Sequence, residues 1–173
     1  MHRRLFTGLA LGAALIAVGP AAAQQPPNPL DAIPDAMPFN LPYGAPISAD
    51  KAHEVLTAAV AEAKKRSWPM NITVVDSGGN LVAFVRMDGA QLASIEISQH
   101  KARAAARFRR ETKILEGAIQ NGLNYLITLD GVIGSRGGIP LVMDGKLVGA
   151  IGVSGGTGSQ DEVIAKAGVA AFK

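Results

Sequence analysis

Apolar residues follow a helical period where the folded region begins. Ser48 is suited to cap a helix, and apolar positions then recur three and four residues apart from Ala52 to Ala63. Three cations, at positions 64–66, suit the C-terminal end of a helix dipole. The pattern predicts a helix over residues 48–66 with one apolar stripe facing a core.

The pattern then changes to short apolar runs separated by turn residues. Residues 71–76 and 80–87 are predicted strands joined by a Ser-Gly-Gly turn, and residues 139–143 and 146–153 flank Asp144-Gly145, the strongest hairpin signal in the chain. Further helices are expected over residues 92–108, 112–120 and 161–172. Helices that alternate with antiparallel hairpins indicate an α+β layer fold.

The first 23 residues have the order of a cleavable signal peptide. Arg3 and Arg4 precede an uncharged apolar stretch from Leu5 to Val18, and three alanines end at Ala23. The alternative, a membrane anchor, needs about 20 apolar residues. We therefore predict cleavage after Ala23, a periplasmic or secreted protein, and no integral membrane segment after cleavage.

Residues 24–46 contain seven of the chain's ten prolines. Proline lacks a backbone N–H, so this stretch is expected to be an extended arm and not a helix or central strand. Two interpretations stay open: a flexible tether, or an arm whose apolar residues lie along a neighbouring subunit. The folded domain is expected over residues 47–173.

Composition narrows the chemistry. The chain has 173 residues and no cysteine, which excludes disulfides, thiolate metal sites and cysteine nucleophiles. The net charge is +3, and loss of Arg3 and Arg4 leaves +1. A domain so close to neutral carries no electrostatic argument for nucleic-acid binding.

The predicted helix 92–108 carries a charged stripe. Its members are spaced i, i+4, i+7 and i+11 and share one face: Glu96, His100, Arg103 and Arg107. The stripe is either a solvated face or a site for an anionic ligand, since guanidinium groups pair with carboxylates and imidazole binds metals. Because this helix has apolar strips on two sides, we also expect a homo-oligomer.

Histidine is the strongest iron ligand left in a chain without cysteine. Only His53 and His100 remain after signal cleavage, which excludes a three-histidine zinc site in one chain but not haem, which needs one or two axial ligands. His53 lies at the edge of the first apolar stripe, where a ligand's ring can face outward. The alternative is an ordinary surface histidine. If haem binds, we expect His53 to be its main ligand, with Arg103 and Arg107 near enough to pair with the propionates.

A glycine-rich loop precedes the last helix. Gly155, Gly156, Thr157 and Gly158 lack the ending of a P-loop and the spacing of a dinucleotide fingerprint. A tight strand-to-helix turn explains them, and the alternative is that their amides hold a small carboxylate. No catalytic residue is assigned.

Two long runs together resemble a known family. The segments VVDSGGNLVAFVRMDGAQLASIEISQHKARAAARF and GGIPLVMDGKLVGAIGVSGGTGSQDEVIAKAG look like the GlcG/HbpS haem-binding family, which is related to the C-terminal domain of PduO-type proteins. The likeness covers residues 47–172. It implies a five-stranded antiparallel sheet flanked by helices in a profilin-like arrangement, homo-oligomers, and a haem-ligating histidine in the region of His53.

The resemblance also sets out the candidate functions. It implies haem as cofactor, with haem-degrading or iron-handling behaviour in some members and a sensory accessory role in others. The acidic Glu-x-x-Glu iron motif of the secreted members is absent here. The alternatives are a periplasmic module that binds a small carboxylate and an oligomeric partner of a membrane sensor. The haem-binding interpretation includes one reaction, a slow peroxide-dependent breakdown of haem.

Overall fold

A computed structural model describes residues 31–173, and residues 37–173 form one compact unit. Its elements are α1 (Ala49–Lys65), β1 (Asn71–Asp76), β2 (Leu81–Arg86), α2 (Ala93–Arg107), α3 (Thr112–Gln120), the 3-10 helix η2 (Asn124–Thr128), β3 (Gly138–Met143), β4 (Lys146–Ser154) and α4 (Gly158–Ala171). The predicted signal peptide lies outside the described residues, as does the arm up to residue 30. Within residues 31–173, no helix combines the length and apolar character needed to cross a bilayer.

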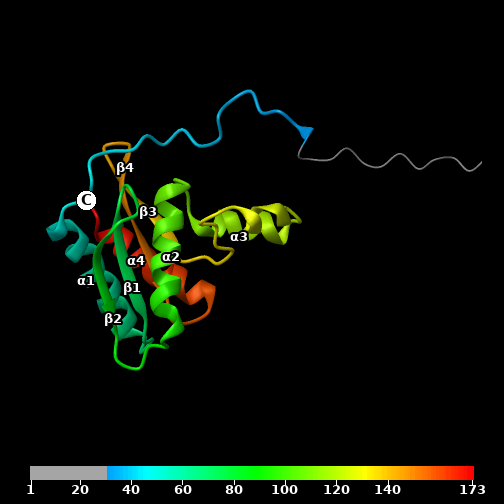
Figure 1. The fold of residues 1–173 in the computed structure, drawn as a ribbon. Coiled ribbons are helices and arrows are strands. Elements are labelled where there is room, and N and C mark those ends of the chain that lie inside the picture. The colour runs from blue at the N-terminus through cyan, green and yellow to red at the C-terminus, as the bar shows by residue number, and fades with distance from the viewer. Residues whose placement is uncertain (1–30) are drawn as a thin grey trace, which may run out of the picture. The chain divides into compact units, whose positions relative to one another are not determined.

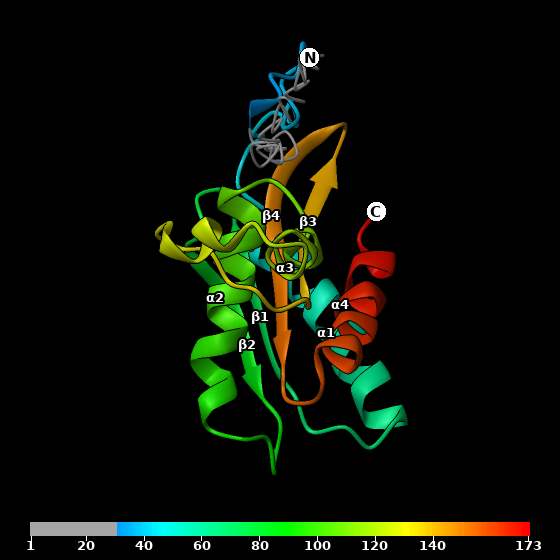
Figure 2. The ribbon, with the colours of Figure 1, turned by 90° about the vertical axis from the view of Figure 1, so that its right-hand side faces the viewer.

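The strands form one antiparallel sheet in the order β2-β1-β4-β3. Helices α1 and α4 pack together against one face of the sheet, and α2 covers the other face (Figures 1 and 2). Helix α3 and η2 extend to the side of these layers (Figure 1). The predicted α+β layer fold is confirmed.

The expected fifth strand is wrong for the described residues, in which the sheet has four strands. The segment before α1 takes its place only briefly, through a single bridge between Tyr43 and Leu147. Leu147 donates to the carbonyl of Pro42 and accepts from the amide of Gly44. Pro42 and Pro46 have no N–H to donate, so the ladder is interrupted, and one further backbone bond follows, from the amide of Ile47 to the carbonyl of Val148.

Local chemistry explains the elements that the sequence predicted. Ser48 caps α1 by accepting from the amide of Lys51. In the β3–β4 turn, Asp144 and Gly145 both have positive φ, 50° and 71°. Two positive φ values give the primed turn that matches the twist of paired strands, as the Asp-Gly sequence predicts.

The two faces of the sheet differ in the size of their side chains. Large apolar residues such as Ile72, Ile151 and Ile164 form the core beneath α1 and α4. On the α2 side the buried cluster is mostly alanine, with Val75 and Leu147 as its larger members. A Cβ added at Gly152 would lie 2.1 Å from the carbonyl oxygen of Ser98, so glycine here lets α2 approach the sheet closely.

The arm does not behave as a tether over residues 39–46. Arg109, in the left-handed region with φ 53°, donates to the carbonyl of Leu41 at 3.0 Å and lies over the ring of Tyr43. The guanidinium of Arg110 lies 3.1 Å from the centroid of the Phe39 ring. Aromatic side chains and free carbonyls therefore hold the arm to its own domain, although its prolines cannot donate.

Candidate functional site

His53 lies on the exposed side of α1, and its ring is oriented by its own helix. Nδ1 lies 2.7 Å from the carbonyl oxygen of Ala49, one turn earlier. A carbonyl can only accept, so Nδ1 carries the proton and Nε2 keeps its lone pair for an external partner. Histidines that bind metals are commonly oriented by such a bond from the second ring nitrogen.

The surface beside His53 is an open, shallow hollow. Its other lining residues are Asp50, Glu54, Thr57, Ala58, Ala61 and Ala171. Three are alanines, which leave room next to the ring for a broad, flat group. Among the described residues, no three His, Asp, Glu or Cys side chains gather to hold a bare metal ion. His53 is the one nitrogen donor among the side chains that line this hollow, beside the carboxylates of Asp50 and Glu54.

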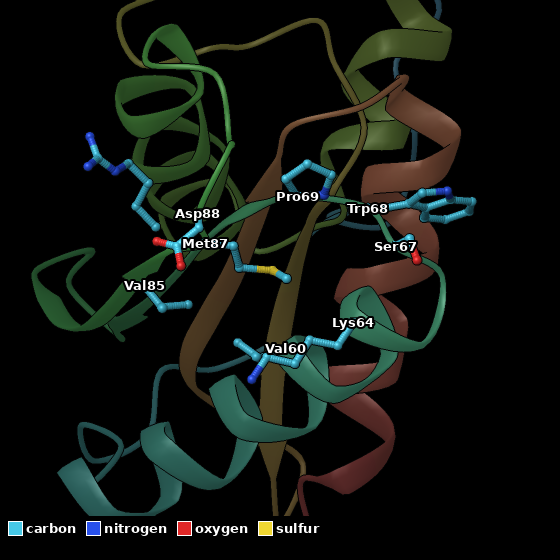
Figure 3. A pocket seen from close by; sticks show the side chains of 9 residues that line it. Val60, Lys64, Ser67, Trp68, Pro69, Val85, Met87 and Asp88 are labelled. Atoms are coloured by element: carbon cyan, nitrogen blue, oxygen red, sulfur yellow. The ribbon is translucent and has the colours of Figure 1, made fainter.

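A second recess lies where α1 ends against β2, and we call it the Met87 recess (Figure 3). It has a volume of about 520 Å³ and is lined by Val60, Lys64, Ser67, Trp68, Pro69, Val85, Arg86, Met87 and Asp88. Met87 points from the end of β2 across toward Val60 and Lys64 of α1 (Figure 3). Most of the lining side chains are apolar, and the charged ones are the cations Lys64 and Arg86 and the carboxylate of Asp88.

The charged stripe predicted on residues 92–108 does lie on α2, but it faces away from His53. Arg103 donates to the side chain of Gln99 at 3.0 Å, and Arg107 donates to the carbonyl of Gly78 at 3.2 Å. Both arginines lie over the β1–β2 turn beside Gly79. Because α1 and α2 cover opposite faces of the sheet, the expectation that these arginines lie near a group bound at His53 is wrong within one chain.

The other two members of the stripe are not brought together as an ion pair. Glu96 is exposed and His100 is half-buried, and neither forms a salt bridge within residues 31–173. No hydrogen bond in that part of the chain orients the ring of His100, in contrast to His53. Of the two candidate ligands, only His53 has a defined ring orientation.

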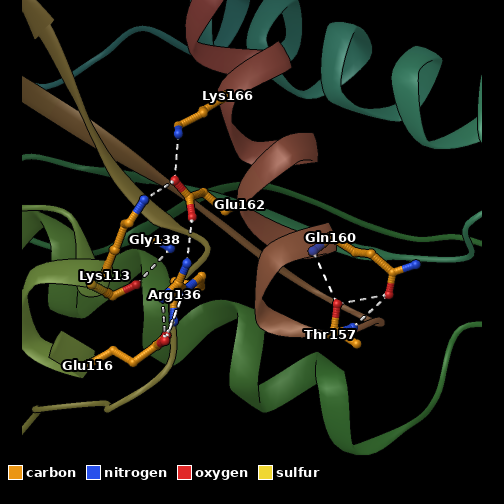
Figure 4. A network of polar contacts seen from close by, with 9 residues as sticks. Lys113, Glu116, Arg136, Gly138, Thr157, Gln160, Glu162 and Lys166 are labelled. Atoms are coloured by element: carbon orange, nitrogen blue, oxygen red, sulfur yellow. Dashed lines mark hydrogen bonds and ion pairs between the residues drawn. The ribbon is translucent and has the colours of Figure 1, made fainter. Parts of the chain in front are cut away.

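The glycine-rich loop uses its amides internally (Figure 4). Gly156 donates to Oδ1 of Asp161 at 3.0 Å, and Thr157 donates to Oε1 of Gln160 at 2.9 Å. The hydroxyl of Thr157 accepts from the amide of Gln160 in return, which completes a capping box at the start of α4. These two amides are therefore occupied, and the loop is explained as a strand-to-helix turn. Two of the amides proposed to hold a carboxylate, those of Gly156 and Thr157, are therefore not available to it. Carboxylate binding at this loop stays a prediction.

A buried ion pair between Lys101 and Asp161 was not predicted from the sequence. Lys101 on α2 is 1% exposed, and its Nζ lies 2.7 Å from Oδ2 of Asp161, which is 2% exposed. Burial raises the pKa of Asp161, and the hydrogen bond from Lys101 opposes that rise. The sequence holds a weak indication that Lys101 is buried. It lies seven positions after Ser94 and three after Ser98, so it shares with these small residues the side of α2 that faces the sheet.

A second polar network lies among α3, α4 and the segment before β3 (Figure 4). Arg136 donates to Oε1 of Glu116 from Nε at 2.9 Å and from Nη2 at 2.7 Å, and its backbone amide donates to Oε2 at 2.7 Å. The Arg136 guanidinium thereby holds the pKa of Glu116 below its usual range. Glu162 interacts with Lys113 and Lys166, and the bond from Lys166 lowers its pKa. These charges are paired with one another and join α3, α4 and the segment before β3.

Comparison with known proteins places these features in context. The family model "Haem degrading protein HbpS-like" matches residues 47–170. Protein GlcG of Escherichia coli K12 is 44% identical over 108 residues, covering 62% of this chain and 81% of its own length. The sequence resemblance to the GlcG/HbpS family is confirmed.

Solved structures agree with the fold. The crystal structure of a PduOC:heme complex has a TM-score of 0.68 and 31% identity, and covers 75% of this chain and 96% of its own. The crystal structure of HbpS has a TM-score of 0.71 and 30% identity, with 80% and 98% covered. One of these similar proteins has thus been crystallised with haem.

Proposed function

The chain belongs to the HbpS-like family, and on this premise we propose that it binds haem through Nε2 of His53. The observation that carries the proposal is the hydrogen bond between Nδ1 and Ala49, which fixes the ring and leaves Nε2 as an acceptor directed away from that bond. Neutral imidazole is a common axial ligand of haem iron. The alanines beside the ring leave space for a planar group.

In this proposal each residue of the hollow has a limited task. His53 supplies the axial ligand, Ala49 holds its tautomer, and Thr57 and the alanines keep the adjacent surface free of bulk. When bound, haem supplies a redox-active iron, on which degradation of haem itself or a sensory accessory role would depend. The structure assigns no acid, base or nucleophile to such a reaction, so we propose binding as the primary function.

We further propose that the protein is exported and works in the periplasm or outside the cell. The support is the order of cationic, apolar and small residues over positions 1–23. Mass spectrometry of the exported protein should find Gln24 as its first residue. Retention of residues 1–23 in that protein would contradict the proposal.

Haem titration tests the binding site. Wild-type protein should develop a Soret band that is shifted from that of free haem and saturates at one haem per site. His53→Ala should shift or abolish the band, and His100→Ala is the matched control, which should leave it unchanged. The proposal fails if His53→Ala binds with unchanged spectrum and affinity, and the α2 site replaces it if His100→Ala alone removes the band.

Self-association is a second proposal, supported by an apolar surface on α3 and η2. Ile114, Tyr125, Ile127 and Leu129 are each at least 43% exposed there. Ile114, Tyr125 and Leu129 also line a small apolar cavity to which Phe39 of the arm contributes. Exposed patches of this kind usually mark interaction sites. Light scattering should give a mass above the monomer for the wild type and a lower mass for Ile127→Glu, and a wild-type monomer at micromolar concentration would overturn the proposal.

A further inference from the structure

One side of helix α1 carries four residues at the same spacing as the charged stripe on α2. His53, Thr57, Val60 and Lys64 stand at i, i+4, i+7 and i+11, so they fall within about 60° of one another around the helix. We call these four residues the α1 flank. Along the helix, the α1 flank begins with His53, the proposed haem ligand, continues through Thr57 and Val60, and ends with the cation Lys64.

The far end of the α1 flank opens into the Met87 recess. Val60 and Lys64 form its α1 wall, while Val85 and Met87 form the wall from β2. Side chains on a helix lean toward its N-terminus, and Figure 3 shows the Lys64 side chain running beside Val60. The ammonium group is therefore nearer to His53 than the separation of about 16 Å between their Cα positions.

Lys64 differs from the two cations that follow it. Lys65 and Arg66 both lie within salt-bridge distance of Glu62, at 4.0 Å and 2.5 Å. Lys64 has no ion-pair partner within residues 31–173. Lys64 and Arg86 both line the recess, and Arg86 likewise has no ion-pair partner within residues 31–173, so an anion that enters there meets cations that are not already neutralised.

We infer that Lys64 binds a carboxylate of the porphyrin whose iron His53 ligates, and that the Met87 recess receives the adjoining apolar edge of the ring. This inference rests on the proposed function. A porphyrin with propionate arms has the required chemistry: a broad apolar body, a metal at its centre and carboxylates at one edge. The α1 flank presents the matching groups in that order along one helix.

Asp88 should determine the orientation of the ligand in the Met87 recess. Its carboxylate also lines the recess, and it repels a carboxylate of the ligand. The anionic edge should therefore lie on the Lys64 side, and Asp88→Asn should tighten binding. A purely apolar ligand would not respond to this change.

Iron-free protoporphyrin IX separates this site from the iron ligand. Trp68 is the only tryptophan of the chain and lines the recess, so quenching of its fluorescence reports occupancy directly. Lys64→Gln keeps most of the side chain and removes the charge. We expect it to weaken protoporphyrin IX about fivefold, the upper range for an exposed ion pair, and Lys64→Arg to restore affinity.

Three controls accompany the titration. Lys65→Gln alters the next lysine, which is 78% exposed and does not line the recess, and should leave the affinity unchanged. His53→Ala should not alter the affinity for the iron-free ring. The dimethyl ester of protoporphyrin IX, which lacks the carboxylates, should not distinguish Lys64→Gln from the wild type. Circular dichroism and the melting temperature confirm that each variant is folded.

The outcomes separate the inference from the proposed function. If haem binding depends on His53 but Lys64→Gln matches Lys65→Gln with protoporphyrin IX, the inference is wrong and the proposed function stands. If protoporphyrin IX leaves Trp68 fluorescence unchanged in the wild type, the inference is likewise wrong. If haem binding is independent of His53, the proposed function fails, and the inference fails with it.

Discussion

The two faces of the sheet place reactive side chains in opposite settings. On the α2 face, Lys101 is fully buried, paired with Asp161, and enclosed by alanine, serine and glycine. On the α1 face, His53 and Lys64 lie at the surface, beside a hollow and a recess. In the first setting the two charges neutralise each other inside the protein, and the second leaves a nitrogen lone pair and a charge available.

This difference separates structural from binding roles. A buried ion pair requires close geometry, and removing either partner leaves an uncompensated charge, so its residues are held by the fold. Exposed residues such as His53 contribute little to folding and are free to be used by a ligand. Substitutions on the α2 face should therefore change stability, whereas those on the α1 flank should change binding.

The largest expected effect is from Lys101→Met, which leaves the Asp161 carboxylate buried without its partner. We expect the free energy of unfolding to fall by about 3–5 kcal/mol, measured by urea denaturation. The double variant Lys101→Met/Asp161→Asn removes both charges and should recover part of the loss. A double variant less stable than the single one would contradict this account.

Gly152→Ala tests how tightly α2 is held to the sheet. The new Cβ would lie 2.1 Å and 2.4 Å from backbone atoms of Ser98 and Ala102, which cannot rotate away. We expect a loss of about 3 kcal/mol, at the upper end for overpacking. Gly117→Ala, in the open on α3, is the matched control and should stabilise by about 0.5–1 kcal/mol. Equal effects at both positions would exclude close packing as the cause.

Glu116→Gln should show a dependence on pH. Arg136 holds the pKa of Glu116 below its unfolded value, so the stabilisation is present above that value and is lost as the pH falls through the folded pKa. We expect the variant to be about 2 kcal/mol less stable at pH 7, with the difference disappearing from about pH 5 downward. A difference in unfolding free energy that is constant from pH 7 to pH 3 would contradict the role of this carboxylate.

His53→Ala should have the smallest effect on stability. The ring is exposed and its only described bond is to its own helix, so the free energy of unfolding should change by less than about 0.5 kcal/mol. The same protein sample should lose the haem spectrum of the wild type. A large loss of stability would show that His53 serves the fold, as Lys101 does.

The sequence predicted the elements well because their signals are local. Capping by Ser48, the Asp144-Gly145 turn and the helical stripes each depend on residues within one or two turns. The fifth strand came only from the family resemblance, and Pro42 and Pro46 explain why it is reduced to a bridge. The layer arrangement followed from the order of the elements.

The parts that could not be predicted depend on contacts between distant residues. Lys101 and Asp161 are 60 positions apart, and nothing near either residue announces the other. The arm is held by Arg109, whose left-handed backbone is not indicated by its sequence. The stripe on α2 was placed on the correct helix, but its position relative to His53 depends on which face of the sheet each helix covers.

The sheet ends in two edges of unequal character. The β3 edge contains Pro140, which cannot donate a hydrogen bond to an incoming strand. The β2 edge has the sequence LVAFVR, with no proline, and Leu81 is 51% exposed. We therefore expect aggregation, after partial unfolding or at high protein concentration, to begin at the edge strand β2. A charged residue in place of Leu81 should make the protein more soluble during purification.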